Sequence, residues 1–506
     1  MHRRDWIKGG LALGALALVS PGAALGRVRS TAGRLTTRTM PIPGLLQSNG
    51  DTPIELTMRA GTWEVTPGAS SPTIGFNGPF LGPTVRLRSG QDVPVVYRNN
   101  LAESVAIHGH GLHVPGELDG GPQREIEPGG TWSVELPIRQ QASTCWYHPH
   151  THGRTAPQAY QGLAGLLIIE DENSDSLPLP KNYGVDDLPV IVQDRSVDND
   201  GRLAYSIEDP EDGFMCDMIT VNGIANATRS VPAGMVRLRL LNGSNARYYR
   251  FRFSDERIFH VIASDGGLLA EPVPVRDLVM LPGERYEIVV DFSEGRPVSL
   301  VSGPALSVGA NDAGRGRRGD GGRRDDWEPG GLRDVFEILQ FTVDPDLPAS
   351  RTPLPRRLNT ITRPTLRSDW PTRRFELFME NGGRRGRRRG DRSPDTPVAM
   401  GINGRSMDMR VINERVRRHQ WERWEIRSFD GSHPFHVHGC SFLVLSQDGR
   451  PVSDAAAGWK DTVRVDDSAE FIVRFEHEAT DEYPYMYHCH ILEHEDMGMM
   501  GQFSVT

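Results

Sequence analysis

One segment near the C-terminus constrains this chain more than any other. Residues 487–499 read Tyr-His-Cys-His-Ile-Leu-Glu-His-Glu-Asp-Met-Gly-Met, so a cysteine stands between two histidines. In an extended strand successive side chains point to opposite faces, so Cys489 faces one way while His488 and His490 face the other. We therefore expect this one strand to contribute to two neighbouring metal sites.

The cysteine face predicts a mononuclear copper site. His494 and Met499 follow Cys489 in a Cys-x4-His-x4-Met pattern. Together with a second histidine they would supply a thiolate, two imidazoles and a weak axial thioether, which is the ligand set of a blue-copper centre. Cys489 would then link this copper covalently to the histidines on either side of it.

The histidine face predicts a second, larger site. A single His-x-His element is weak evidence, because an alternating strand often places two histidines together, but this chain has four such elements. Imidazole suits copper, and eight histidines match a cluster of three copper ions better than they match ordinary core or surface histidines. The eight are His108, His110, His148, His150, His436, His438, His488 and His490.

These motifs form an internal duplication. Residues 107–111 (Ile-His-Gly-His-Gly) echo residues 435–439 (Phe-His-Val-His-Gly), and residues 146–150 (Trp-Tyr-His-Pro-His) echo residues 486–490 (Met-Tyr-His-Cys-His). Two related domains should therefore face each other across a shared metal site. Pro149 takes the place of Cys489 in this register, so only the last domain can hold the blue centre.

Composition and patterning predict an all-β chain of several domains. The 506 residues include 55 Gly and 37 Pro, which suits short strands joined by turns. Segments such as 236–240 and 471–475 alternate or run apolar as strands do. The length exceeds one domain, and we expect boundaries in the polar stretch 173–180 and in the connector 345–367.

With these motifs the chain resembles the three-domain multicopper oxidases from about residue 45 to the C-terminus. It is most similar to the bacterial copper-efflux oxidase and laccase branch, because residues 110–123, 459–463 (Trp-Lys-Asp-Thr-Val) and 493–496 (Glu-His-Glu-Asp) read like that branch. The resemblance implies three consecutive cupredoxin-like Greek-key barrel or sandwich domains. These would span residues 45–172 and 368–506, which carry the ligands, and residues 173–345, which act as a spacer.

The resemblance also implies four copper ions and two acids. The type 1 ion would be held by His433, Cys489, His494 and Met499, the type 2 ion by His108 and His436, and the type 3 pair by His110, His148, His150, His438, His488 and His490. Asp119 and Glu495 match catalytic acids beside the cluster, where a carboxylate relays protons or orients an imidazole. An ordinary loop aspartate and a surface glutamate remain the alternative for these two.

An oxygen-dependent, laccase-like oxidase is the activity that the resemblance implies. A small reducing substrate would give electrons to the type 1 copper, and the cluster would reduce dioxygen to water. The alternative is a copper-binding or envelope scaffold protein of the same family without turnover, although a scaffold should lack several ligands and none is missing here. A copper nitrite reductase would not need eight cluster histidines.

The reducing substrate stays open between a phenol and cuprous ion. The arginine-rich run 382–392 stands where copper-efflux oxidases have a methionine-rich insert, and guanidinium groups repel the cation that thioethers capture. No methionine occurs in residues 429–432, just before His433. Copper homeostasis is therefore only one of the roles that the chain could have.

The first 26 residues predict a twin-arginine signal peptide. Arg3 and Arg4 precede the apolar run 11–19 and small residues at 23–26. That run is too short to span a bilayer comfortably, although a permanent anchor is the alternative. We expect a periplasmic or secreted monomer that uses the twin-arginine export machinery and has no stable membrane insertion.

The arginine-rich and glycine-rich runs and the three remaining cysteines are not expected to take part in the chemistry. The runs 314–324 and 382–392 are rich in arginine and glycine, but the net charge is −9, so we expect solvated insertions and no nucleic-acid partner. Cys145, Cys216 and Cys440 allow at most one internal disulfide. Their pairing stays open, and small buried packing residues are the expected role.

Overall fold

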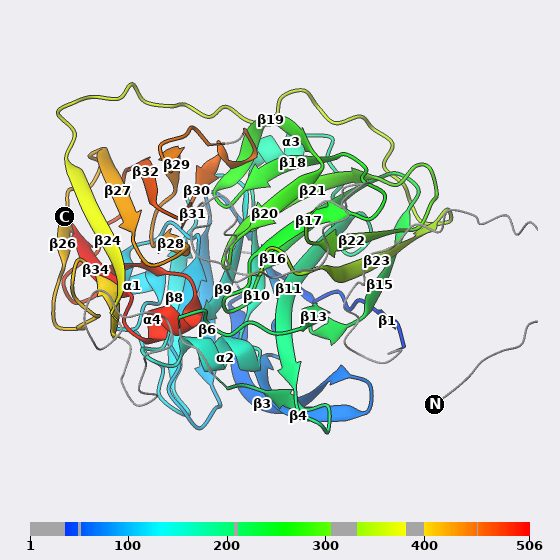
Figure 1. Ribbon diagram of the computed structural model, residues 1–506, viewed down its shortest axis with the longest axis horizontal. Coiled ribbons are helices and arrows are strands. Elements are labelled where there is room, and N and C mark those ends of the chain that lie inside the picture. The colour runs from blue at the N-terminus through cyan, green and yellow to red at the C-terminus, as the bar shows by residue number, and fades with distance from the viewer. Residues whose placement is uncertain (1–35, 49–51, 207–210, 305–330, 381–398, 453) are drawn as a thin grey trace, which may run out of the picture.

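The computed structural model describes residues 36–48, 52–206, 211–304, 331–380, 399–452 and 454–506. These residues are almost entirely strands and turns, which confirms the predicted all-β class with three cupredoxin-like domains, each built from two sheets. In Figure 1 the green middle domain occupies the right of the view and the orange and red third domain the left. The predicted signal peptide and both arginine-rich and glycine-rich runs lie outside the described residues.

The first domain packs a five-stranded sheet against a four-stranded sheet. The five-stranded sheet has the order β2 (Leu45–Gln47), β5 (Thr84–Arg88), β10 (Gly165–Glu170), β9 (Ser143–Pro149) and β7 (Ile107–His110). The four-stranded sheet has the order β4 (Ala69–Phe76), β3 (Ile54–Thr66), β6 (Asp92–Asn99) and β8 (Thr131–Pro137). Three short helices accompany them: α1 (Gly116–Asp119), α2 (Thr155–Gln161) and α3 (Glu172–Ser176).

The middle domain contains a six-stranded and an eight-stranded sheet. The first has the order β1 (Arg38–Thr39), β15 (Ala227–Pro232), β23 (Phe336–Asp344), β22 (Val298–Ser302), β17 (Tyr249–Phe253) and β20 (Asp277–Met280). The second has the order β14 (Ile224–Ala225), β13 (Met218–Val221), β11 (Asp187–Val197), β16 (Met235–Asn242), β21 (Arg285–Asp291), β18 (Phe259–Ser264) and β19 (Gly267–Val275), with β12 (Leu203–Ala204) paired to β11.

The third domain again has two sheets. The six-stranded sheet has the order β25 (Ala399–Ile402), β24 (Thr372–Glu380), β27 (Glu422–Ser428), β32 (Ser468–Val473), β29 (Phe442–Gln447) and β30 (Trp459–Lys460). The five-stranded sheet has the order β26 (Glu414–Val416), β34 (Met500–Val505), β33 (Tyr485–Cys489), β28 (His433–Val437) and β31 (Thr462–Val465). A 3-10 helix η2 (Asp454–Ala456) and the helix α4 (Leu492–Asp496) complete the domain.

The internal duplication appears as the same strand pairing in the first and third domains. The antiparallel strands β7 and β9 place His108 opposite His148. The antiparallel strands β28 and β33 place His436 opposite His488. Each domain therefore offers a histidine-bearing pair of antiparallel strands with the same register, as the repeated motifs predict.

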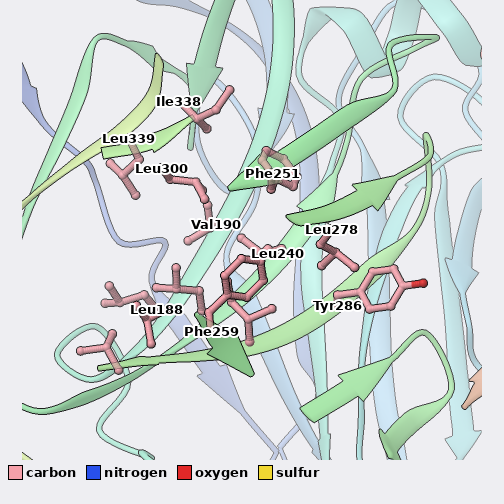
Figure 2. Packing of buried hydrophobic residues seen from close by; sticks show 14 of the residues in the cluster. Leu188, Val190, Leu240, Phe251, Phe259, Leu278, Tyr286, Leu300, Ile338 and Leu339 are labelled. Carbon is pink, nitrogen blue, oxygen red and sulfur yellow. The ribbon is translucent and has the colours of Figure 1, made fainter. Parts of the chain in front are cut away.

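Strand β16 shows how alternation divides core from interface. Val236, Leu238 and Leu240 point into the middle-domain core, where Figure 2 shows Leu240 beside Val190, Phe259 and Leu278. Arg237 and Arg239 lie on the opposite face of the strand and are nevertheless buried. That face is covered by the first domain, because the Arg239 guanidinium donates to the hydroxyl of Thr144 on β9 at 2.9 Å.

The two arginines make an acid-sensitive contact. Glu287 on β21 accepts hydrogen bonds from Nε of Arg237 at 2.8 Å, from Nη1 of Arg239 at 3.0 Å and from the Thr144 hydroxyl at 2.6 Å. Burial alone would raise the pKa of Glu287, but the guanidinium groups outweigh it and lower the pKa to about 2. The carboxylate therefore favours the folded state above its unfolded pKa of roughly 4.3, and this contribution is lost as the pH falls through about 2.

We predict that Glu287→Gln destabilises the copper-free protein by about 3 to 5 kcal/mol at neutral pH, because it leaves the buried Arg237 without its carboxylate partner and Arg239 with Asp187 alone. The difference from the wild type should narrow as the pH falls from about 5 towards 2. Urea unfolding midpoints at a series of pH values measure this difference in stability. The control is Glu271→Gln, because Glu271 is exposed. A difference that does not change with pH contradicts this account.

Candidate metal centres

Three of the four predicted type 1 ligands meet in one buried triad. His433 begins β28, Cys489 ends β33 and His494 lies on α4. The Cys489 sulfur is 3.4 Å from His433 Nδ1 and 3.5 Å from His494 Nδ1, and the two nitrogens are 3.3 Å apart. The antiparallel pairing of β28 with β33 brings the first two together, and the turn into α4 brings the third.

This triad fits a single metal ion. Bonds of about 2.0 to 2.3 Å in a trigonal arrangement place ligand atoms roughly 3.5 Å apart, close to the three separations in the structure. The Cys489 sulfur also accepts the backbone N–H of Ile491 at 3.4 Å, which favours the thiolate. Burial raises the pKa of the Cys489 thiol, so a bound ion has to displace its proton.

Met499 is tied to the triad through its backbone. Its N–H donates to the carbonyl oxygen of His494 at 2.8 Å, and its own carbonyl accepts from the N–H of Cys489 at 3.1 Å. The side chain is fully buried in the third-domain core. Its role as an axial ligand stays a prediction.

The eight cluster histidines converge between the first and third domains. All are buried, with four from each domain. His108 stacks on His438, and His110 stacks on His436, each pair with ring centroids 3.7 Å apart. His488 Nε2 lies 3.4 Å from His150 Nε2 and 3.2 Å from His438 Nε2. The structure thus brings together every histidine that the sequence places in the cluster.

The donor set fits metal ions because its ring nitrogens are buried and unsatisfied. Seven nitrogens on six of these rings have no hydrogen-bond partner among the described residues: Nε2 of His108, His148 and His436, Nδ1 of His110 and His150, and both nitrogens of His490. A buried polar atom left unpaired is costly, whereas coordination would satisfy it. Burial also lowers the pKa of seven of the eight histidines, that of His490 to about 3. Neutral imidazole is the form that binds a metal.

Hydrogen bonds from the imidazoles to surrounding oxygens decide which nitrogen of each ring is available to a metal ion. Nδ1–H of His108 donates to the carbonyl oxygen of Asp119 at 2.8 Å, and Nδ1–H of His436 donates to that of Asp461 at 2.8 Å. In the same way His148 and His488 donate to the carbonyls of their next residues. These bonds leave Nε2 for a metal. His110 is turned the other way, since its Nε2 contacts the Asp461 carboxylate at 3.2 Å.

Asp119 and Glu495 both lie beside cluster imidazoles. The Asp119 carboxylate accepts from His438 Nδ1–H at 2.7 Å. The Glu495 carboxylate lies 3.3 Å from His488 Nδ1 and 3.5 Å from His150 Nδ1, and it accepts from the Thr155 hydroxyl at 2.7 Å. Neither is an exposed side chain, because both are at most 1% exposed. Their contacts suit them to orienting imidazoles.

Asp461 is the site residue that the sequence analysis missed. It lies in the 459–463 motif, which carried the resemblance but received no role. Through its carbonyl it holds His436 and through its carboxylate it contacts His110, whereas Asp119 holds His108 through its carbonyl and His438 through its carboxylate. The two aspartates are therefore counterparts in the duplication. Each one bridges a histidine of its own domain to one of the other domain.

The remaining cysteines behave as expected. Cys145, Cys216 and Cys440 are buried free thiols, which confirms their role as small packing residues. Among the described residues, no helix is both long enough and apolar enough to cross a membrane.

Comparison with known proteins places these features in a family. Residues 57–174 and 382–506 each match a multicopper oxidase family model. The cell division protein FtsP of Pectobacterium atrosepticum is 42% identical over 469 residues, which cover 92% of each chain. The chain belongs to the multicopper oxidase family. The resemblance inferred from the sequence is thereby confirmed.

A second FtsP protein and a solved structure are also similar to this chain. The FtsP protein of Escherichia coli is 38% identical over 510 residues, covering 100% of this chain and 99% of its own. The solved structure of the laccase-like multi-copper oxidase CueO from Ochrobactrum sp. has a TM-score of 0.80 and 36% sequence identity, covering 92% of this chain and 100% of that one.

The expectation of an oxygen-reducing oxidase is wrong on these comparisons. Relatives about 40% identical over more than nine tenths of the chain are named cell division proteins, not enzymes. The physical reason is that a fold and its ligands do not by themselves establish turnover. His433 and His494 are each 1% exposed, and His494 Nε2–H donates to the carbonyl of Glu211 at 3.1 Å. Both imidazoles predicted to bind the type 1 ion are therefore buried.

We predict that Cys489→Ser abolishes the intense blue absorption of the copper-loaded protein and lowers its copper content by about one ion per chain, because a hydroxyl does not replace the thiolate. Visible spectra and metal analysis measure the two effects. Cys440→Ser is the control, since Cys440 is another buried free thiol of the same domain. Retention of the blue colour in Cys489→Ser would refute the type 1 assignment.

Proposed function

We propose that this protein is a copper-binding protein of the cell envelope that serves cell division as a scaffold, without catalytic turnover. One observation carries the proposal: the chain is 38 to 42% identical, over nine tenths of its length or more, to proteins named cell division protein FtsP. The non-turnover alternative from the sequence analysis thus replaces the oxidase, and its dioxygen and reductant partners are withdrawn.

Copper has an architectural role in this proposal. Four ions are assigned to the predicted ligands, one to the triad with Met499 and three to the eight histidines. Because four cluster ligands come from each of two domains, the free energy of copper binding becomes free energy of domain docking. When bound, copper at such a site also supplies redox chemistry, but in this chain the surrounding residues hold it in a closed interface.

The cover over the type 1 ligands supports the absence of turnover. The carbonyl oxygen of Glu211 in the middle domain accepts from His494 Nε2–H at 3.1 Å. Gly213 has a φ of +69°, and a Cβ there would lie 2.5 Å from the Ala246 Cβ and 2.7 Å from the Ile491 Cγ2. The segment therefore packs directly against Ile491, which lies between the predicted type 1 ligands Cys489 and His494 in the sequence.

The location of the protein outside the cytoplasm is part of the proposal. Residues 1–26 read as a twin-arginine signal, so the protein would reach the periplasm or the exterior through the twin-arginine export machinery. We propose that it acts there as a monomer, with no nucleic-acid partner and no stable membrane insertion. A folded, copper-linked pair of outer domains is the kind of rigid body that a scaffold requires.

Copper stoichiometry and oxygen uptake test the absence of turnover. We predict about four copper ions per chain, and oxygen uptake with cuprous ion or a dimethoxyphenol no faster in the wild type than in Cys489→Ser, because the type 1 imidazoles are closed to a reductant. Cys440→Ser serves as the matched control for thiol loss. Rapid uptake that Cys489→Ser abolishes would overturn this part of the proposal.

Genetic rescue tests the scaffold role separately. In cells whose division depends on this chain, the wild type and Cys489→Ser should restore normal cell length equally, because a scaffold needs the fold and not electron entry. The signal variant Arg3→Lys with Arg4→Lys should fail to rescue while the protein accumulates inside the cell. Rescue by the wild type but not by Cys489→Ser, at equal protein levels, would contradict a non-catalytic role.

A further inference from the structure

A cluster of buried charges joins the middle domain to the metal site. Arg285 at the start of β21, with Asp265 and Glu284, belongs to the middle domain, whereas Lys460 and Asp461 belong to the third domain. All five side chains are at most 4% exposed. None of them is among the copper ligands that the sequence predicts, and the middle domain was expected to act only as a spacer.

Arg285 uses all of its donors and touches all three domains. Nη1 and Nη2 bind the two carboxylate oxygens of Asp461 at 2.8 and 2.6 Å. Nε donates to the carbonyl of Thr144 in the first domain at 3.0 Å. The remaining two N–H groups donate to the carbonyls of Gly283 and Asp265. A guanidinium has five donors in a fixed fork, so its position is fully determined here.

Asp461, held in place by Arg285, in turn orients the imidazoles of His110 and His436. Its Oδ1 accepts from His110 Nε2–H at 3.2 Å and its carbonyl accepts from His436 Nδ1–H at 2.8 Å. These two rings form one of the two stacked pairs across the domain interface. Asp461 therefore leaves Nδ1 of His110 and Nε2 of His436 for metal, and both of these nitrogens are buried without a hydrogen-bond partner among the described residues.

The other buried cation is occupied elsewhere. Lys460 binds Asp265 at 2.9 Å and Glu284 at 2.6 Å, and its ammonium lies over the Tyr286 ring at 4.4 Å. Arg285 thus supplies the counter-charge that the Asp461 carboxylate meets at hydrogen-bond distance. Without it, the carboxylate would be buried near the like charge of Asp265, and the hydroxyl of Thr462, 3.0 Å from Oδ1, would be its remaining side-chain donor besides His110.

We propose that Arg285 is a positioning residue for the copper cluster: it holds Asp461 so that His110 and His436 present the correct nitrogens, and it makes copper retention depend on docking of the middle domain. This inference rests on the proposed copper binding. The middle domain then acts on the cluster without contributing a ligand to it. Residues that fix a ligand's orientation from outside typically change metal affinity by roughly 10- to 100-fold.

Competition with a chelator tests the proposal. In Arg285→Gln, we expect cluster copper to be released at a chelator concentration roughly tenfold or more below that needed for the wild type, with an altered type 2 signal in electron paramagnetic resonance. The blue band of the Cys489 site should be unchanged and serves as an internal reference. Arg285→Lys should retain copper to an intermediate degree, because an ammonium reaches one carboxylate oxygen where the guanidinium reaches two.

The matched control is Arg239→Gln. Arg239 is another buried arginine of the middle domain that contacts the first domain, but its carboxylate partners are Asp187 and Glu287. The Arg239→Gln variant should be less stable than the wild type, but it should retain copper as the wild type does and show the same type 2 signal. If Arg285→Gln does not fold, Asp461→Asn tests the same link and should show the same earlier release.

Each outcome decides the question. Wild-type copper retention and an unchanged type 2 signal in Arg285→Gln or Asp461→Asn would overturn this inference alone. Equal copper release from Arg239→Gln would also overturn it, because the effect would then be a general loss of stability. A wild-type protein that takes up no cluster copper would overturn the proposed copper binding, and this inference with it.

Discussion

The structure depends on an interface made of imidazoles. Eight buried histidines, four from each of two domains, face one another with several ring nitrogens that nothing in the described chain satisfies. Unpaired buried nitrogens oppose folding, so this interface is unfavourable until cations fill it. In the proposed function, metal binding and docking of the first and third domains are consequently one process, because the fold brings the two histidine-bearing sheets together.

The middle domain supports that interface through charge rather than through ligands. The fully buried guanidinium of Arg285 contacts the first domain, the third domain and its own domain. Its partner Asp461 contacts one cluster imidazole of the first domain and one of the third. A second segment of the same domain covers His494. Both contacts assign the middle domain a more active part than that of a spacer, and both favour a closed, rigid body over a site open to substrates.

Much of the site could be predicted from the sequence because side-chain alternation in strands is a local property. The pattern around Cys489 places sulfur and imidazole on opposite faces, and the duplicated motifs place the second set of histidines. Asp119 was assigned through the resemblance, whereas Asp461 received no role there, and its contact with His436 joins residues 25 positions apart in the sequence. Arg285 lies 176 residues from Asp461 and in no motif. Turnover was wrongly expected because ligand motifs specify a metal and not access to it, and the carbonyl that covers His494 lies 283 residues away.

Hydrogen exchange of the copper-loaded and copper-free protein tests the central claim most directly. If copper links the first and third domains, loading should slow amide exchange in β7 and β9 as well as in β28 and β33, since opening the interface would then require release of the metal. Exchange that is slowed in the third domain alone, or in neither domain, would contradict a copper cluster shared between them.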